Sequence, residues 1–450
     1  MQQEEILDLI DQKDFHQLKH ILRDMLVPDV AEILQEIEEP ANLVRIFRLL
    51  PKDMGAEVFS YIDEDMQEII VNYLTDKELA YIMEELYTDD AVDFLEEMPG
   101  NVVERALKVS TPETRKVVNK FLSYEEDTAG AIMTSEFLDV NIDMSVAEAL
   151  ARVKKIADDV QTMSYLFVVD GKRTLKGIVS IRDFILAEPN VPIKDIMDDN
   201  IVFANVNEDQ EQIALTFQKY DIQVLPVVDK EHRLVGVVTG DDVMEVIEEE
   251  ATKDIQQMAG VVSTDKPYLR TSVWHTMLTR LPWLVILMVS ATFTGIIINA
   301  YETTLSSLLF ACVPMLMGTG GNAGSQASIT ITRGIALNEI EFKDLLSVVW
   351  KEIRISVLTG LILAVVCFGK LQLIDRLIFG YEYTPLVSLA VSLALFGTVF
   401  IAKFVGCILP LLAKKIKLDP AVVASPFITT IVDVLSLIVY CSISIAILGA

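Results

Sequence analysis

The chain has 450 residues, of which 52% are hydrophobic and 23% are charged, and its formal net charge at pH 7 is −29. One soluble domain does not normally combine so much apolar with so much charged sequence. The two properties are segregated: from Lys266 onward there are 13 Lys and Arg against 9 Asp and Glu, which leaves 24 against 57, a net charge of −33, in the first 265 residues. An acidic excess of this size excludes nucleic acid and anionic lipid as partners and attracts cations.

Repeated short helices are predicted in the first part of the chain. Between residues 25 and 122 a phrase recurs, as in LVPDVAEILQEI, LLPKDMGAEVFSYI and YLTDKELAYIMEEL. Each copy offers Pro, Thr or Ser as a start signal, early acids and apolar residues at helical spacing. We therefore expect an acidic, all-α superhelical domain over residues 1–129, of the kind that usually serves as a scaffold or interaction surface.

A second repeat occupies residues 130–250. YLFVVD with LKGIVSIRDFI returns as VLPVVD with LVGVVTGDDVM, and each copy predicts a strand, a helix, two strands and a closing helix. The pair resembles tandem α+β CBS domains. In that family the motif Ser/Thr-x-x-Asp can hold an adenosine ribose, which would make Ser180, Asp183, Thr239 and Asp242 an ATP site. Alternatively, each hydroxyl caps the next helix, because a capping box has the same spacing without a ligand.

Uncharged runs of membrane-spanning length follow. Ile355–Gly369 is short and becomes a span if Lys370 extends its charge to the membrane surface. The longer runs, the last of them interrupted by one acid, are Leu281–Ala300, Thr303–Thr332, Tyr383–Ala402 and Ala421–Ala450. Five α-helical spans are therefore predicted. Lys and Arg concentrate in the loops after the second and fourth spans, which places the N-terminus in the cytoplasm and the C-terminus outside.

Two of these runs hold polar groups at membrane depth. PMLMGTGGNAGSQ is rich in glycine. ASPFITTIVDVLSL places Asp433 near mid-membrane, where insertion of an acidic residue costs roughly 2.5 to 3.5 kcal/mol of free energy and marks a functional site. Glycine-rich backbone at this depth packs closely on another helix or lines a wet cavity. Carboxylate, carbonyl and hydroxyl oxygens are the ligands that hard cations prefer. A cation pathway is predicted, lined around Asp433 by Gly320, Gly321, Asn322, Gly324, Ser425, Pro426 and Thr429.

GTGGNAGSQ, LDPAVVASPFITTIVDV, the CBS pair and the acidic repeats stand in the order of the MgtE family of magnesium channels, which the chain resembles over essentially its whole length. The resemblance implies a Mg²⁺-selective channel for uptake across the inner or plasma membrane of a bacterium. It implies a homodimer with the pore on its two-fold axis. A connecting helix over residues 251–275 would join the CBS pair to a transmembrane domain over residues 276–450. The family's equivalent of Asp433 binds Mg²⁺, largely through water that the ion keeps.

The resemblance also implies regulation by cytosolic Mg²⁺. Bound ions would screen the repulsion between acids of the helical and CBS domains and favour a compact, closed state, which is negative feedback on uptake. The regulatory metal ligands carried over from the family are Asp89, Asp90, Asp93, Asp209, Glu211, Asp221, Asp242, Glu245, Glu250 and Asp254. Two residues depart from the family's pattern: Lys253 stands where some relatives have an acid, and Ser425 where some have Asn.

Other classes of function fit the sequence less well. An enzyme is not expected, because the sequence offers neither a nucleophile with its base and orienting group nor a P-loop. A nucleotide-sensing regulator with a membrane anchor would need neither Asp433 nor a polar glycine-rich span. A secondary divalent-cation transporter coupled to Na⁺ or H⁺ remains the alternative, because one intramembrane acid serves either scheme. Lys403, within the fourth span, has no interpretation beyond snorkelling.

Overall fold

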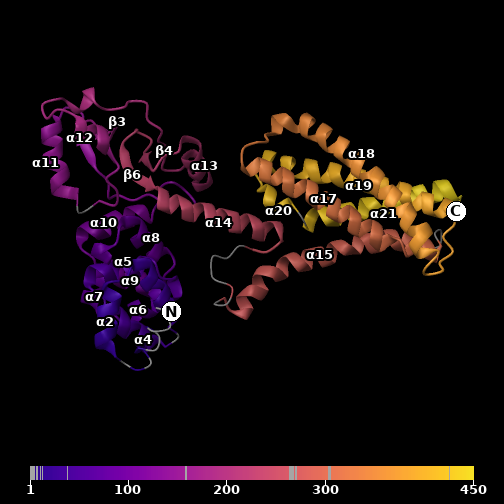
Figure 1. Cartoon of the computed structure of the whole chain (residues 1–450), viewed down its shortest axis with the longest axis horizontal. Coiled ribbons are helices and arrows are strands. Elements are labelled where there is room, and N and C mark those ends of the chain that lie inside the picture. Colours follow the sequence, from indigo (N-terminus) through magenta and orange to yellow (C-terminus); the bar gives the residue numbers. More distant parts are fainter. Residues whose placement is uncertain are drawn as a thin grey trace. The chain divides into compact units, whose positions relative to one another are not determined.

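The computed structural model describes residues 6, 9, 10, 12, 14–37, 39–157, 160–262, 268, 271–302, 306–424 and 426–449. The chain divides into two compact units, Met1–Ile247 and Glu248–Ala450 (Figure 1). The first unit holds the predicted helical repeats and the CBS pair, and the second holds the long apolar helices.

Short helices succeed one another through the first part of unit 1. Alternate helices pack side by side, α3 on α5, α5 on α7 and α7 on α9. The ring of Phe59 in α5 packs edge to face on the rings of Phe47 in α4 and Phe94 in α8. The ring centroids are 6.3 Å and 5.1 Å apart, respectively. The helices are α2 (Phe15–Arg23), α3 (Val27–Gln35), α4 (Pro40–Phe47), α5 (Lys52–Ser60), α6 (Glu64–Tyr73), α7 (Asp76–Glu85), α8 (Thr88–Glu96), α9 (Gly100–Val109) and α10 (Pro112–Phe121).

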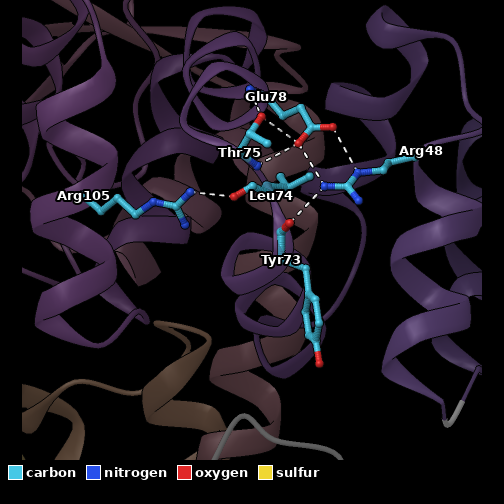
Figure 2. A network of polar contacts seen from close by, with 6 residues as sticks. All are labelled: Arg48, Tyr73, Leu74, Thr75, Glu78 and Arg105. Carbon is cyan, nitrogen blue, oxygen red and sulfur yellow. Dashed lines mark hydrogen bonds and ion pairs between the residues drawn. The ribbon is translucent and has the colours of Figure 1, made fainter.

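The turn between α6 and α7 shows how the repeats are joined (Figure 2). The Thr75 hydroxyl accepts the backbone N–H of Glu78, and the Glu78 carboxylate accepts the backbone N–H of Thr75 at 2.7 Å, so the start signal acts as a capping box. Arg48, just after α4, donates to both carboxylate oxygens of Glu78, and Arg105 of α9 donates to the carbonyl oxygen of Leu74 at 2.6 Å. Two arginines thus tie α4 and α9 to one turn.

The two CBS copies have the predicted order of elements. Each forms a three-stranded sheet in which the first two strands are parallel and the last two antiparallel. The registers correspond, since Val168 pairs with Gly177 in the first copy and Val227 with Gly236 in the second. The first copy comprises β1 (Asp139–Asn141), α11 (Val146–Ile156), β2 (Tyr165–Val169), β3 (Leu175–Ser180) and α12 (Ile181–Leu186). The second comprises β4 (Ala204–Asn205), α13 (Gln210–Tyr220), β5 (Val224–Val228), β6 (Leu234–Thr239) and α14 (Gly240–Met258).

The helical domain and the second CBS copy share one hydrophobic core. Buried residues of the repeats, such as Phe94 and Phe121, belong to the same cluster as Phe217 of α13 and Val243 and Val246 of α14. Because apolar burial stabilises roughly in proportion to area, this shared core holds α14 against the helical domain. The first turns of α14 are therefore placed by packing, and their acids with them.

The connector between the CBS pair and the membrane region differs from the predicted helix over residues 251–275. Helix α14 already begins at Gly240 and ends at Met258, and Gly260 follows with a φ of +71°. This left-handed backbone favours glycine and ends the helix. Residues 263–267, 269 and 270 of the predicted connector lie outside the described residues, and α15 begins at Val273.

Unit 2 has four helical stretches in its described residues that are long and apolar enough to cross a membrane: Val273–Tyr301, Phe342–Asp375, Pro385–Lys415 and Pro426–Leu448. The glycine-rich run forms α17 (Val313–Ala336), whose 24 residues do not belong to this apolar set. Helices α17, α19 and α21 pack against one another. The elements are α15 (Val273–Tyr301), α16 (Ser307–Phe310), α17, α18 (Leu345–Gly369), α19 (Pro385–Lys415), α20 (Pro420–Ala424) and α21 (Pro426–Leu448).

The short third run is part of a longer helix than expected. A 3₁₀ turn at Phe342–Asp344 precedes α18, and a π-helical segment, Lys370–Asp375, continues it. The Lys370 ammonium lies 2.7 Å from the Asp375 carboxylate. An ion pair between Lys370 and Asp375 thus lies at the end of this helix.

Candidate cation sites

Five predicted regulatory ligands gather between α8 and α14. Asp89 and Asp90 lie in the first turn of α8, and Asp93 follows on the same side, because residues three or four positions apart share a helix face. Asp242 and Glu245 lie in the first two turns of α14. Burial is the largest cause that raises the pKa of each of the three α8 acids, and the charge of Asp242 raises all three further. The fold therefore brings together two groups that are far apart in the sequence.

Asp89 is the most buried member of this α8–α14 cluster. The residue is 4% exposed, and one carboxylate oxygen accepts the backbone N–H of Asp90 at 3.0 Å. Its Oδ2 atom is buried and has no hydrogen-bond partner among the described residues. Burial, followed by repulsion from Asp242 and Asp90, holds the pKa of Asp89 well above its usual range. A buried carboxylate oxygen without a partner costs free energy that a bound cation would offset.

The other acids of the cluster are crowded as well. Burial and then the charges of Asp242 and Glu245 raise the pKa of Asp90 to about 7. Burial raises the pKa of Asp242 to about 6, although the Thr239 hydroxyl and N–H donate to it and lower it in part. Asp93 reaches solvent, yet desolvation by the surrounding protein and the Asp90 charge raise its pKa. The cluster repels itself whenever its members are ionised.

The donor set fits a hydrated hard cation. No three His, Cys, Asp or Glu side chains in the described part of the chain are arranged to hold a metal ion by themselves. Mg²⁺ usually keeps several waters and takes one or two carboxylates, whereas structural Zn²⁺ takes four direct protein ligands. The cluster therefore suits Mg²⁺, with Asp89 Oδ2 as the donor that lacks another partner.

A second acidic group lies in unit 2 around Asp254. Burial, followed by the charges of Asp419 and Glu250, raises the pKa of Asp254 to about 6. Lys253 lies 3.2 Å from Glu250 Oε1, and its charge lowers the pKa of Asp254 in part. Asp419 was not predicted, although it precedes α20 within LDPAVVASP and its carboxylate accepts the N–H of Ala421 at 2.8 Å. The motif itself was the signal that could have identified Asp419.

The three predicted ligands around α13 are not brought together within one chain. Asp209 caps the N-terminus of α13 and accepts the backbone N–H of Glu211 at 2.9 Å. Asp221 stands at the other end with a φ of +51°. Since α13 has 11 residues, the two ends are roughly 16 Å apart. One ion cannot contact both ends of the same helix.

The first Ser/Thr-x-x-Asp motif of the CBS copies forms a helix cap, and in the second the Thr239 N–H and hydroxyl donate to the Asp242 carboxylate. Ser180 accepts the backbone N–H of Asp183 at 3.1 Å, and its hydroxyl donates to the Asp183 carboxylate at 2.7 Å. The Thr239 hydroxyl lies 2.5 Å from Asp242 and also contacts Asp241. Capping therefore accounts for the first motif without a ligand, and Asp242 belongs to the α8–α14 cluster as well.

Asp433 lies two turns into α21 and is partly exposed. Ser425, one of the predicted pore-lining residues, lies outside the described residues, and Pro426 is the first residue of α21. Thr429 and Thr430 donate to the Pro426 carbonyl at 2.8 and 3.1 Å. Their oxygens keep lone pairs one turn before Asp433, as a cation pathway requires.

The glycines of α17 allow close packing. A Cβ atom on Gly320 would lie 2.7 Å from Thr398 Cγ2, and one on Gly324 would lie 2.9 Å from Ile428 Cγ2. A Cβ atom on Gly406 of α19 would lie 2.2 Å from the carbonyl oxygen of Gly324. The backbones of α17 and α19 are therefore in direct contact, and Gly320 and Gly324 serve the first of the two roles that the sequence left open.

A polar face of α17 lies apart from these contacts. Asn322, Gln326 and Thr330 recur every four residues and are exposed, which puts them on one side of the helix. Gly321 is buried, and a Cβ atom there would lie 3.2 Å from Thr429 Cγ2. Of the predicted pore-lining residues on α17, Gly320, Gly321 and Gly324 are buried and Asn322 is exposed.

A buried ion pair, unforeseen in the sequence, lies between α18 and α19. Lys403 Nζ is 3.7 Å from Glu352 Oε2, and each side chain is 10% exposed. Glu352 Oε2 has no hydrogen-bond partner among the described residues. Snorkelling is therefore the wrong account of Lys403, whose charge is held inside the helix packing beside an opposite charge.

Comparison with known proteins gives matches along the chain in order. Residues 25–127 match the MgtE intracellular N domain, residues 129–190 and 193–249 match the CBS domain, and residues 313–443 match MgtE, a divalent cation transporter family. The magnesium transporter MgtE of Thermus thermophilus is 35% identical over 449 residues, 98% of each chain. That of Bacillus subtilis is 29% identical over 440 residues, 95% of each chain.

Among solved structures, the cytosolic domain of the Mg²⁺ channel MgtE in complex with ATP is similar to part of this chain. It covers 54% of this chain and 99% of its own length, at 35% sequence identity and a TM-score of 0.52.

Proposed function

Because the chain belongs to the MgtE family of magnesium transporters, we propose that it is a Mg²⁺-selective channel for magnesium uptake that cytosolic Mg²⁺ closes. The proposal includes a homodimer in a bacterial inner or plasma membrane, with the N-terminus in the cytoplasm and the C-terminus outside. Helix α17 would be the fifth span beside the four apolar helices. Its 24 residues are long enough to cross a bilayer, and its packing between α19 and α21 reduces its need for apolar side chains.

The pore half of the proposal rests on Asp433. Two copies across a two-fold axis would place two negative charges at one depth of the membrane, which attracts a divalent cation. The exposed polar face of α17, with Asn322, Gln326 and Thr330, would supply neutral oxygens to the water around the ion.

The regulatory half rests on one observation above others: Asp89 Oδ2 is buried without a partner among the described residues, next to further carboxylates. Without a cation, the charges of Asp90, Asp242 and Glu245 oppose the contact between α8 and α14. A Mg²⁺ ion bound there would reverse the sign of this interaction and favour the compact, closed state.

ATP is proposed as a second regulatory ligand of the CBS pair. The support is the ATP complex of the related cytosolic domain. The residues proposed for it are Ser180, Asp183, Thr239 and Asp242. In this structure the Ser180 and Thr239 hydroxyls donate to the carboxylates of Asp183 and Asp242.

The alternative is a secondary transporter that couples Mg²⁺ to Na⁺ or H⁺. Single-channel recording of the purified protein in lipid bilayers separates the two, since discrete conductance steps exceed any alternating-access turnover. Steps that vanish when millimolar Mg²⁺ is added to the face of the soluble domains support the proposal. Uptake without resolvable conductance, dependent on a Na⁺ or H⁺ gradient, would support the alternative.

A further inference from the structure

The carboxylate of Glu136, in the first CBS domain, caps a helix of another domain. Its Oε2 atom accepts the backbone N–H of Thr88 at 3.1 Å and the Thr134 hydroxyl at 2.7 Å, and its Oε1 atom accepts the Thr88 hydroxyl at 2.7 Å and the Ser135 hydroxyl at 2.8 Å. Thr88 is the first residue of α8, and the N-cap residue Tyr87 provides no side-chain cap. The backbone N–H of Thr88 therefore has Glu136 as its partner, while the Thr88 hydroxyl also lies 2.7 Å from the Ser135 hydroxyl.

The segment of residues 134–136 is also bound to β6, the strand that leads into α14. Thr134 and Val237 of β6 exchange two backbone hydrogen bonds, at 2.8 and 3.0 Å. A Cβ atom on Gly236 would lie 2.5 Å from Met133 Sδ and 2.9 Å from the Thr134 carbonyl oxygen, so the glycine allows residues 133 and 134 to lie directly against β6. Since β6 ends at Thr239 and α14 begins at Gly240, residues 134–136 connect the start of α8 with the start of α14.

This inference rests on the proposed regulation. We propose that Glu136 is a positioning residue for the regulatory cation site: its bonds to Thr88 hold the first turn of α8 opposite Asp242 and Glu245 before any cation binds. Hydrogen bonds to an ionised group are stronger than neutral ones, and a negative charge at a helix N-terminus is favourable. The latch, defined as the two bonds between Glu136 and Thr88, thus opposes the repulsion within the α8–α14 cluster.

A competing role is that Glu136 is one more repelling charge. Burial, Asp242, Glu245 and Asp241 each raise the pKa of Asp90 more than Glu136 does. The two roles predict opposite outcomes, because removal of a repelling charge would lower the Mg²⁺ concentration needed for closure, whereas loss of the latch would raise it.

The test measures the Mg²⁺ midpoint of channel closure in full-length protein with Glu136→Gln, Thr88→Val and Thr88→Ser. Thr88→Val removes the hydroxyl at nearly constant volume and leaves the Glu136 charge in place, and Thr88→Ser retains the hydroxyl. We expect the midpoint to rise about threefold to tenfold with Glu136→Gln and with Thr88→Val, and to stay near wild type with Thr88→Ser. Glu104→Gln, an exposed acid on α9, is the matched control.

Two further readouts separate positioning from loss of folding and from failure of the proposed regulation. Open-state conductance at low Mg²⁺ should be unchanged in all variants. Hydrogen exchange of the peptide that contains Thr88, in EDTA, should be about tenfold faster in Glu136→Ala than in wild type, whether or not Mg²⁺ regulates the channel. A lower midpoint for Glu136→Gln, a wild-type midpoint for Thr88→Val, or unchanged exchange would overturn the latch. If Mg²⁺ does not close the wild-type channel but exchange at Thr88 is still faster in Glu136→Ala than in wild type, the proposed regulation is wrong and the latch is supported.

Discussion

Lys403 of α19 and Glu352 of α18 form an ion pair, with 3.7 Å between Nζ and Oε2, inside the helix packing of unit 2. The desolvation of two buried charges costs several kcal/mol per ion, which their attraction repays only in part. Loss of one partner leaves the other charge buried and uncompensated. The pair therefore constrains both helices even though its net contribution to stability is modest.

We predict that Lys403→Met destabilises the membrane region by about 3–5 kcal/mol, because Glu352 is left alone in the interior. The exchange of both residues, Lys403→Glu with Glu352→Lys, should restore most of the loss. Thermal unfolding of detergent-purified protein measures both, with Lys351→Met, an exposed lysine on α18, as the control. A Lys403→Met protein as stable as wild type would show that the pair carries no constraint.

Asp433→Asn and Asp433→Ala should lose divalent conduction by at least about tenfold while still assembling in the membrane, since each would remove both pore charges from the proposed dimer. Growth of a transport-deficient bacterium at low Mg²⁺ and flux into liposomes provide the measurement, with the exposed Glu382→Gln as control. Wild-type flux from folded Asp433→Asn protein would contradict the pore assignment.

Joint neutralisation of Asp89, Asp90, Asp242 and Glu245 should keep the channel open at Mg²⁺ concentrations that close wild type. The substitutions remove repulsion, but they also remove the ion bridge, which is the larger effect if a bound ion contacts both helices. Limited proteolysis in the segment of residues 252–262 provides a second measurement, because wild type should be cut at low Mg²⁺ and protected at millimolar Mg²⁺. Closure of the quadruple variant at the wild-type concentration would contradict the sensing role.

Without divalent cations, the stability of unit 1 should fall as pH rises from about 4 to about 7. The folded state raises the pKa of Asp90 to about 7 and of Asp242 to about 6, above an unfolded value of about 3.9. Each group then holds a proton in the folded state that the unfolded chain has lost, so its ionisation costs stability between these two values and the cost is complete above about pH 7.

Thermal unfolding of EDTA-treated full-length protein between pH 5 and 8 checks this pH dependence, and Asp90→Asn should flatten it. Millimolar Mg²⁺ should flatten it as well, because the ion offsets the repulsion that appears on ionisation. A melting temperature that is constant from pH 5 to pH 7 in EDTA would show that the cluster does not titrate in this range.

The two CBS clefts should differ in nucleotide affinity. Among the described residues, the hydrogen bonds of the Asp183 carboxylate lie within its own cap, whereas Asp242 also faces the acids of α8, which repel phosphate. We expect Asp183→Ala to weaken ATP binding more than Asp242→Ala in calorimetry with and without Mg²⁺. Absence of heat for wild type would leave capping as the role of both motifs.

The order of elements was accessible from the sequence because the signals are local or repeated. Thr75 and Glu78 have the spacing of a capping box, which predicts a helix start. The two CBS copies corroborate each other, so the strands and helices of the CBS copies were predicted correctly. The acids of α8 and α14 were assigned through the family resemblance alone, because periodicity along one helix says nothing about which distant helix packs against it.

Ion pairs and hydrogen bonds between residues far apart in the sequence were not predicted. Glu352, Asp419 and Glu136 are single acids whose partners are chosen by tertiary packing. Lys403 looked anomalous for the same reason, since its counter-charge lies on another helix. Glycines could be located but not assigned to packing or to a pore, because both roles require the absence of a side chain.

The contact between Gly324 and Gly406 has a mechanical consequence. Because backbone meets backbone there, no side chain exists whose rotamer could absorb a displacement of α17 against α19. Separation of the two helices would open an empty gap, and sliding would bring Cβ atoms of neighbouring residues into collision. We therefore expect α17 and α19 to move as one rigid body in the proposed gating. We expect α15 to yield more readily, because its main packing partner among the long helices is α21 and its apolar residues are largely exposed.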